Sequence, residues 1–414
     1  MHLSWPGGPL RGTAQLPASK SEANRALILR ALAGGGTLDN LSDANDTQLM
    51  QRLLIEASNT DVLDAEDAGT VMRFLTAYLA VSGWRGRLTG TARAQERPIA
   101  VLVDALRQAG ARISYLNAEG YPPLAFGGFA AAADATEPTA LSVRGDISSQ
   151  YISALLMVGL RLSGGLCLTL TGAVGSRPYI SMTVALMQRF GADCVAAGDV
   201  LTVRPGQYRP TDYVIESDWS AASYWYALVA LAPAGSEITL PGLRRESLQG
   251  DQAIAAMMTQ FGVETIFLPD AVHLRQVPLA PQVAIPTLDF TDCPDLAQTV
   301  AVVAAALARP VDMTGLESLR IKETDRIAAL QTELAKFGGD LRDLGKGRFR
   351  AESSGFAVAN QSVATYHDHR MAMAFAPLAL RGGLVVESPA VVRKSYPQFW
   401  QELAKSGFAV SEAD

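Results

Sequence analysis

The residues best suited to chemistry in this chain of 414 residues are cations that stand beside hydroxyl groups at expected helix starts. The first group is Ser19-Lys20-Ser21, with Arg25 close behind, directly before an Ala/Leu-rich run. Free amides at a helix start and the helix dipole favour an anion, and the two cations add full charges. We expect this segment to bind a small anionic group. A solvated helix cap without a ligand is the alternative.

Similar groups recur along the chain, each at an expected helix start or in the loop after a strand. The later cations are Arg73, Arg97, Arg177, Arg320, Lys322, Arg326, Arg370, Arg393 and Lys394. Hydroxyl and amide groups stand around them, namely Ser21, Thr70, Ser148, Ser149, Gln150, Ser176 and Tyr179. Such groups bind phosphate esters and sugar-like hydroxyls. Surface solubility explains any single basic residue, but their matching positions indicate a site for small anions.

Two carboxylates, Asp295 and Glu323, lie inside the cationic segments. Nearby cations stabilise their charge whereas partial burial opposes it, so either group can be tuned for proton transfer. The alternative is that each one only balances a neighbouring cation. His367 and His369 flank Asp368, but no third ligand with recognisable spacing accompanies them, so we expect no metal.

These residues are positioned by a layout that appears six times, which indicates an internal repeat. Each copy has a polar opening, an Ala-rich apolar helix, a Gly or Pro break, a strand and a second, amphipathic helix. The polar openings begin at Ser19, Asp67, Asp146, Asp218, Asp292 and His367. The strands are expected at 37–41, 87–90, 166–171, 237–241, 310–314 and 384–387. Helices with so little polar face are typical of burial on most sides.

Composition excludes several classes of protein. Apolar residues make up 49% of the chain, but no run approaches the roughly 20 residues of a membrane span, and the start lacks a secretory pattern. We therefore expect a cytoplasmic protein. Three cysteines without metal spacing are expected to be free buried thiols, and a net charge of −6 disfavours a nucleic-acid surface. The sequence has no nucleophile elbow, P-loop or dinucleotide fingerprint, which disfavours serine hydrolysis and nucleotide use.

The order of these motifs resembles the 5-enolpyruvylshikimate-3-phosphate synthase (EPSP synthase) family almost end to end. The segments that carry the resemblance are Ser19–Arg25, Ala68–Arg73, Glu96–Ile99, Ser148–Gln150, Ser176–Tyr179, Pro294–Asp295, Lys322–Arg326, Asp368–Ala374 and Lys394–Pro397. The resemblance implies an α/β (α+β) fold of two similar domains, each with three βαβαββ repeat units and buried helices, hinge-linked around an interdomain cleft. We place domain 1 at residues 1–16 and 216–414, and domain 2, with a shortened first repeat, at 17–215.

The reaction implied by the resemblance is transfer of the enolpyruvyl group of phosphoenolpyruvate to the 5-hydroxyl of shikimate 3-phosphate, with release of phosphate and without a cofactor. A monomer without a nucleic-acid or membrane partner is expected, and glyphosate is the expected inhibitor. Residues matching the family's shikimate 3-phosphate site are Lys20, Ser21, Arg25, Ser148, Ser149, Gln150, Ser176, Tyr179, Asp295, Ser318 and Lys322. Those matching its phosphoenolpyruvate site are Lys20, Gly69, Arg97, Gln150, Arg326, Arg370 and Lys394.

For the chemistry we expect Asp295 to accept the 5-hydroxyl proton and Glu323 to protonate the methylene carbon, with Lys20 as an alternate proton partner. The chain departs from the family at Asp67 (usually Asn), Phe74 (commonly Pro) and Ser318 (often Asn). Two alternatives stay open. One is the related transferase acting on UDP-N-acetylglucosamine, which usually carries a reactive Cys in a loop that here, at 91–95, has none. The other is a non-catalytic phosphometabolite-binding protein.

Overall fold

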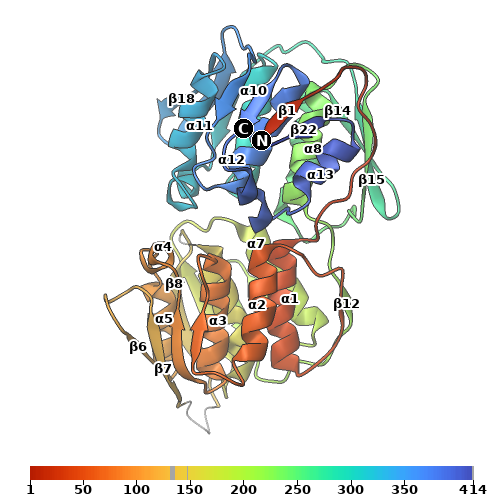
Figure 1. The fold of residues 1–414 in the computed structure, drawn as a ribbon. Helices are drawn as coiled ribbons and strands as arrows, with labels where there is room; N and C mark the ends of the chain where they lie inside the picture. The colour runs from red at the N-terminus through yellow and green to blue at the C-terminus, as the bar shows by residue number, and fades with distance from the viewer. Residues whose placement is uncertain (131–135, 147, 413–414) are drawn as a thin grey trace. The chain divides into compact units, whose positions relative to one another are not determined.

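The computed structural model describes residues 1–130, 136–146 and 148–412 (Figure 1). The chain forms two compact units. Unit 1 consists of Met1–Ala18 and Glu216–Asp414, and unit 2 consists of Ser19–Ile215. The crossings were expected near Leu16 and Ile215. No helix in the described part of the chain is long and apolar enough to cross a membrane.

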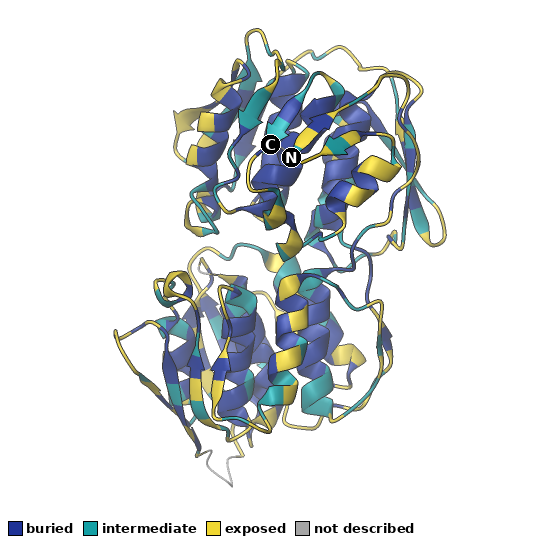
Figure 2. Cartoon of the chain, viewed as in Figure 1, coloured by how far each residue is buried: buried dark blue, intermediate teal, exposed yellow. Residues whose placement is uncertain are grey.

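The first helix of every repeat is largely buried, and Figure 2 shows that much of the helical interior is dark blue. In unit 2 these helices are α1 (Lys20–Ala33), α3 (Gly69–Val81) and α6 (Ser149–Val158). In unit 1 they are α8 (Trp219–Leu231), α10 (Ala297–Ala306) and α12 (His369–Phe375). Every predicted polar opening leads into one of them, although the opening at Asp292 first forms the 3₁₀ turn η4 (Pro294–Leu296) because its proline fixes φ there. Ile147 of the third opening lies outside the described residues.

Side-chain caps explain where several of these helices begin. Ser19 accepts a hydrogen bond from the Glu22 amide, Ser148 from Gln150, Asp218 from Ala221 and Asp368 from Arg370. Each cap satisfies one of the amides that a first turn leaves without a partner. The caps therefore fix the backbone at the same points where the sequence places its hydroxyls and cations.

Among the described residues, five sheets have four strands and one has two. Each four-stranded sheet joins a parallel pair to an antiparallel pair. In unit 2 the sheets are β4 (Val62–Asp64), β5 (Arg85–Thr89), β7 (Leu124–Phe129), β6 (Ala111–Tyr115); and β10 (Cys194–Ala197), β11 (Val200–Val203), β9 (Leu166–Thr171), β8 (Thr139–Arg144). In unit 1 they are β14 (Val263–Phe267), β15 (Ala271–Gln276), β13 (Glu237–Pro241), β2 (Arg11–Thr13); β16 (Thr287–Asp289), β17 (Val311–Thr314), β19 (Arg348–Ser353), β18 (Gly339–Gly345); and β20 (Gln361–Val363), β21 (Leu384–Val386), β1 (His2–Ser4), β22 (Ala409–Ser411).

The sheet pairing shows how unit 2 is inserted into unit 1. Strand β2 runs parallel to β13, the strand after α8, so the whole of unit 2 lies in the chain between β2 and α8. The two-stranded sheet joins the beginning of unit 2 to its end. It pairs β3 (Leu38–Asp39), which follows α1, with β12 (Tyr213–Val214) at the unit's other end. The first repeat therefore lacks its own strand pair, as its short sequence predicted.

The second helices complete the repeats. They are α2 (Asn45–Glu56), α5 (Ala100–Gln108), α7 (Arg177–Arg189), α9 (Ile254–Met257), α11 (Arg326–Ala335) and α13 (Phe399–Lys405). The remaining short elements are α4 (Ala92–Gln95), η1 (Gly159–Arg161), η2 (Gly250–Ala253), η3 (Met258–Phe261), η5 (Glu317–Ile321), η6 (Ala376–Leu380) and η7 (Pro389–Lys394).

Candidate functional site

The candidate residues of unit 2 begin with Lys20 and Arg25 on α1. The Lys20 ammonium nitrogen lies 3.2 Å from a carboxylate oxygen of Asp46, which is buried in the first turn of α2. Arg25 is almost fully buried and donates to Thr183 Oγ1 at 2.7 Å, to the Ser21 carbonyl at 2.8 Å and to Ser153 Oγ at 3.0 Å. Its position is therefore fixed by α1 itself and by hydroxyls from α6 and α7.

Arg25 is a buried cation whose recorded partners are neutral. Its guanidinium carbon lies 5.4 Å from the centre of the Phe74 ring and 5.8 Å from that of Tyr179. Burial lowers the Arg25 pKa to about 10, although the nearby Tyr179 and Glu22 act in the opposite direction. No ion pair to a carboxylate is recorded for Arg25 within the described residues, so an anionic ligand would relieve the cost of burying its charge.

A second group in unit 2 surrounds the start of α3. Arg73 donates to Gln150 Oε1 at 2.7 Å, and the Gln150 amide donates to Thr70 Oγ1 at 2.9 Å. Arg73 also stacks over the Tyr151 ring, 5.0 Å from its centre. Arg97, from the loop before α5, donates to the Asp67 carbonyl at 3.4 Å. These contacts link the starts of α3 and α6 through one guanidinium and one amide.

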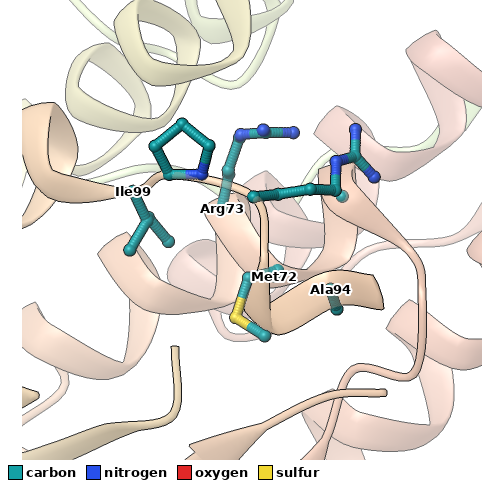
Figure 3. A pocket seen from close by; sticks show the side chains of 7 residues that line it. Met72, Arg73, Ala94 and Ile99 are labelled. Atoms are coloured by element: carbon teal, nitrogen blue, oxygen red, sulfur yellow. The ribbon is translucent and has the colours of Figure 1, made fainter. Parts of the chain in front are cut away.

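A small cavity opens beside this second group, and Figure 3 shows Met72, Arg73, Ala94 and Ile99 around it. Gly69, Arg97 and Pro98 complete its lining. A Cβ on Gly69 would lie 2.7 Å from Arg73 Nη1 and 2.7 Å from Arg97 Nη1. Gly69 is absent from the positive-φ residues, so its backbone conformation does not demand a glycine. The close approach of the two guanidinium groups favours a glycine, because an added methyl group would displace these flexible side-chain ends.

Three of the serines expected in the shikimate 3-phosphate site lie at helix starts in unit 2. Ser148 caps α6, and Ser149 is the first residue of that helix and is buried. Ser176 precedes α7 with φ of 55°, in the left-handed region that a non-glycine residue rarely adopts. Such strain is often found at binding sites because the surrounding structure must hold the residue in place.

In unit 1 the candidate residues converge on Arg326, the first residue of α11. Arg326 is 1% exposed and donates to Asp295 at 2.9 Å, to Glu323 at 2.8 Å and to Asp368 at 2.6 Å. The three carboxylates come from η4, from the segment before α11 and from the cap of α12. One guanidinium therefore holds both proposed proton-transfer groups.

Other cations of unit 1 surround the same carboxylates. Arg370 donates to Asp295 Oδ2 at 2.9 Å, and Lys394 lies 4.0 Å from Glu323. Lys322 is near enough for its charge to act on Asp295. Ser318, in η5, is partly exposed and has no hydrogen bond recorded among the described residues. The structure thus gathers every expected unit 1 residue except Ser318 around two carboxylates.

The electrostatics of this cluster favour ionised groups. Burial alone would raise the pKa of Asp295, but the charges of Arg370, Lys322 and Arg326 outweigh it and hold the pKa well below its ordinary value. Burial opposes the charge on Arg326 as well, yet Asp368, Glu323 and Asp295 keep its pKa above the ordinary value. In this arrangement Asp295 is a weak base, and it becomes a stronger one only when its cations are engaged elsewhere.

Sequence reasoning gave no role to several residues that contact the candidate residues in one unit or the other. Arg73 appeared only among the cations, Asp368 only within a motif, and Ser153 and Thr183 not at all. Its position in the same motif as Gly69 and Thr70 could have flagged Arg73, whereas the hydroxyls that hold Arg25 come from helices distant in sequence. In the described residues no group of three or more His, Cys, Asp or Glu side chains is arranged to hold a metal ion.

A family model and two curated relatives all identify the same enzyme family. The family model of EPSP synthase (3-phosphoshikimate 1-carboxyvinyltransferase) matches residues 52–403. A 3-phosphoshikimate 1-carboxyvinyltransferase of Bacteroides fragilis strain YCH46 is 46% identical over 407 residues, covering 97% of this chain and 96% of the relative. One from Methanospirillum hungatei is 34% identical, covering 96% of each chain.

Solved structures share the fold. The EPSP synthase of Acinetobacter baumannii superposes with a TM-score of 0.80 at 20% sequence identity and covers 99% of both chains. The enolpyruvyl transferase NikO from Streptomyces tendae gives a TM-score of 0.73 at 15% identity, covering 100% of this chain and 99% of that one. Together these matches confirm the resemblance that the motifs carried and the two-domain α/β fold class.

Proposed function

The chain belongs to the EPSP synthase family, and we infer that it transfers the enolpyruvyl group of phosphoenolpyruvate to the 5-hydroxyl of shikimate 3-phosphate, releasing inorganic phosphate. This reaction belongs to the shikimate pathway, which leads to the aromatic amino acids. The observation that carries the proposal is the arrangement around Arg326, which holds Asp295 and Glu323 at 2.9 and 2.8 Å and surrounds them with further cations. A reaction of two anionic substrates with proton transfer at both ends needs these two kinds of group together.

Binding of shikimate 3-phosphate is assigned to the hydroxyl-rich side of unit 2. Ser148, Ser149 and Ser176 stand at helix starts, where hydroxyls and free amides suit a phosphate group. Ser21, Arg25, Gln150 and Tyr179 take the ring and its hydroxyls, with Lys322, Ser318 and Asp295 contributing from unit 1. Arg25 supports this role because its buried charge has neutral recorded partners.

Binding of phosphoenolpyruvate is assigned mainly to cations, with a glycine and a glutamine beside them. Lys20, Gly69, Arg97 and Gln150 belong to unit 2, whereas the unit 1 members are Arg326, Arg370 and Lys394. Gly69 supports the assignment because the absence of a side chain there brings two guanidinium groups against the backbone. Several cations are required because this substrate brings both a phosphate and a carboxylate.

In the addition step Glu323 gives a proton to the methylene carbon of phosphoenolpyruvate, and C2 becomes electrophilic. The 5-hydroxyl oxygen attacks C2 while Asp295 accepts its proton, which forms a tetrahedral intermediate. Anionic substrate groups that engage Arg370 and Arg326 weaken the hold of these cations on Asp295, so substrate binding itself raises the basicity of the base. In elimination the C2–phosphate bond breaks and releases phosphate, while a methyl proton passes to one of the two carboxylates, Asp295 or Glu323, with Lys20 as the alternate acceptor.

A phosphate-release assay tests the proposal. The protein is supplied with phosphoenolpyruvate and either shikimate 3-phosphate or UDP-N-acetylglucosamine, and phosphate is measured over time. We expect release only with shikimate 3-phosphate. Release with the nucleotide sugar would instead favour the related transferase. No release with either substrate, despite calorimetric binding of shikimate 3-phosphate, would leave a binding protein.

We also propose that the protein acts as a monomer in the cytoplasm and that glyphosate inhibits it in competition with phosphoenolpyruvate. Size-exclusion chromatography with light scattering tests the first proposal, and a mass twice the 43.9 kDa of the chain would contradict it. Inhibition measured at several phosphoenolpyruvate concentrations tests the last one.

A further inference from the structure

Asp251 is a buried carboxylate of unit 1 that neither the motifs nor the proposed reaction uses. It lies in η2 and is 3% exposed. One of its oxygens, Oδ2, accepts a hydrogen bond from the hydroxyl of Ser220 in the first turn of α8. The other, Oδ1, is buried with no hydrogen-bond partner in the described residues. A buried carboxylate with an unsatisfied oxygen is costly, so its retention calls for an explanation.

Ser220 connects Asp251 to the cluster around Asp295. Its hydroxyl oxygen lies 3.4 Å from Arg370 Nη2, and the same nitrogen donates to Asp295 Oδ2 at 2.9 Å. A hydroxyl has one hydrogen, so donation to Asp251 leaves its lone pairs for Arg370. Two carboxylates therefore act on one guanidinium, Asp295 directly and Asp251 through the hydroxyl.

We propose that Asp251 is a positioning residue that holds Arg370 through the Ser220 hydroxyl and, on taking up a proton, makes this guanidinium more available to an anionic group of phosphoenolpyruvate. The inference rests on the proposed function, which assigns Arg370 to that substrate. When Asp251 is ionised it competes with the substrate for the charge of Arg370. When Asp251 is neutral the cluster gains one unit of positive charge and binds an anion more strongly.

The surroundings of Asp251 favour proton uptake near neutral pH. Burial, followed by the charge of Asp295, raises the pKa of Asp251 to about 7, whereas Arg370 and the Ser220 hydrogen bond act in the opposite direction. The charge of Asp218, at the cap of α8, also raises the pKa of Asp251, and the thiol of Cys293 is close enough for its own pKa to be raised partly by Asp251. A bound anion adds negative charge and raises the pKa of Asp251 further, so binding and proton uptake reinforce each other.

The test compares the wild type with Asp251→Asn, Ser220→Ala and a matched control, Asp312→Asn. Asp312 is another buried aspartate of unit 1, in β17, but it pairs with Arg348 and Arg350 of the neighbouring strand β19. The KM for phosphoenolpyruvate is measured at saturating shikimate 3-phosphate from about pH 6 to pH 9. The substrates ionise in the same way for the wild type and for every variant. The ratio of the variant KM to the wild-type KM at each pH therefore isolates the contribution of Asp251.

We expect Asp251→Asn to lower the KM for phosphoenolpyruvate about fivefold at the alkaline end, with no change at the acidic end. The wild-type KM should therefore rise toward alkaline pH. Ser220→Ala removes both the hydrogen bond that favours ionised Asp251 and the hydroxyl that connects it to Arg370, so this rise should become smaller and move to higher pH. The control should follow the wild-type profile. A purely structural role for Asp251 would change the Tm or kcat without changing the pH dependence of KM.

A second readout does not depend on turnover. The side-chain carboxyl ¹³C signal of Asp251, assigned by its absence in Asp251→Asn, should titrate near neutral pH and shift upward when phosphoenolpyruvate binds. A signal that titrates in the ordinary aspartate range, near pH 4, would overturn the inference. So would equal KM profiles for active wild type and Asp251→Asn. An inactive wild type whose Asp251 signal titrates near neutral pH and responds to the ligand would overturn the proposed reaction alone.

Discussion

The candidate residues of the two units differ in what partners their arginines have. In unit 2, Arg25 is held by two hydroxyls and a carbonyl, and Arg73 by an amide oxygen and an aromatic ring. In unit 1, Arg326 is held by three carboxylates, one of which also takes Arg370. The same residue type is therefore buried with neutral partners in one unit and with acidic partners in the other.

Under the proposed function, this difference would separate substrate binding from proton transfer. A guanidinium with neutral partners is ready to accept an anion at once, because no carboxylate has to be displaced. A guanidinium paired with carboxylates binds an anion only in competition with them, but that competition is what changes the basicity of Asp295. Under the proposed function, the arginines of unit 2 would anchor phosphate groups, and the carboxylates of unit 1 would change their basicity when the substrate binds.

The largest expected effect comes from replacing the central arginine of each unit by methionine. Arg326→Met leaves three carboxylates without their shared cation, which should cost about 3–5 kcal/mol of unfolding free energy. Arg25→Met should change stability by no more than about 1 kcal/mol, because Ser153 and Thr183 still bond to each other and the buried charge is gone. It should instead raise the KM for shikimate 3-phosphate about 100-fold.

Calorimetric melting of both variants and of Arg52→Met, an exposed arginine that pairs with Glu66, checks the stability part. The surface control should melt within about 1 kcal/mol of the wild type. Equal destabilisation by Arg25→Met and Arg326→Met would show that stability does not depend on whether the buried arginine has neutral or acidic partners.

The next prediction concerns which carboxylates on Arg326 transfer protons. Asp295→Asn and Glu323→Gln should each lower kcat about 100-fold or more. The KM for phosphoenolpyruvate should not rise, because neither variant removes a cation and each removes a carboxylate that competes with the substrate. Asp368→Asn is the matched control, because it contacts the same guanidinium but caps α12 and has no proposed proton role. It should keep most of the turnover.

Single-turnover measurements separate chemistry from binding in these three variants. If Asp368→Asn lost as much turnover as the other two, all three carboxylates would act only by holding Arg326. A loss of affinity without a loss of turnover in Asp295→Asn or Glu323→Gln would lead to the same conclusion.

The sequence predicted the scaffold of this site better than its interior contacts. Strands 166–171 and 237–241 and the burial of the first helices followed from local signals, since caps, apolar runs and breaks act within a few residues. The predicted strand at 37–41 proved shorter, Leu38–Asp39, because it pairs only with β12 from the far end of unit 2. Pairing partners so distant in sequence leave no local signal.

The same limit applies to the residues behind the site. Asp295, Glu323 and Arg326 were selected through motifs, but their convergence with Asp368 depends on how η4, α11 and α12 pack. Asp251 was missed because η2 is a short 3₁₀ turn without periodicity, and a single Asp in a polar segment is usually a solvated residue. Its burial against α8 is a tertiary property that neither composition nor spacing contains.

The smallest expected effect concerns Gly69 of unit 2, which lines the small cavity beside Arg73 (Figure 3). A methyl group in Gly69→Ala would lie 2.7 Å from Arg73 Nη1 and Arg97 Nη1, so these flexible ends must move while the α3 backbone stays helical. We expect normal folding, a KM for phosphoenolpyruvate raised about threefold, and a larger loss for glyphosate, which is longer and needs more of the same space. Gly35→Ala is the control, since its added carbon meets Pro210 at an ordinary 3.7 Å.

Inhibition and Michaelis constants for wild type, Gly69→Ala and Phe74→Leu decide between two roles for this region. Phe74 replaces the family's usual proline, and its buried ring faces Arg25. A change confined to shikimate 3-phosphate in Phe74→Leu would assign the ring to the Arg25 anchor, whereas a change in glyphosate inhibition would connect it with Gly69. Equal losses for inhibitor and phosphoenolpyruvate in Gly69→Ala would show that the glycine serves the placement of the two arginines and does not discriminate between ligands by length.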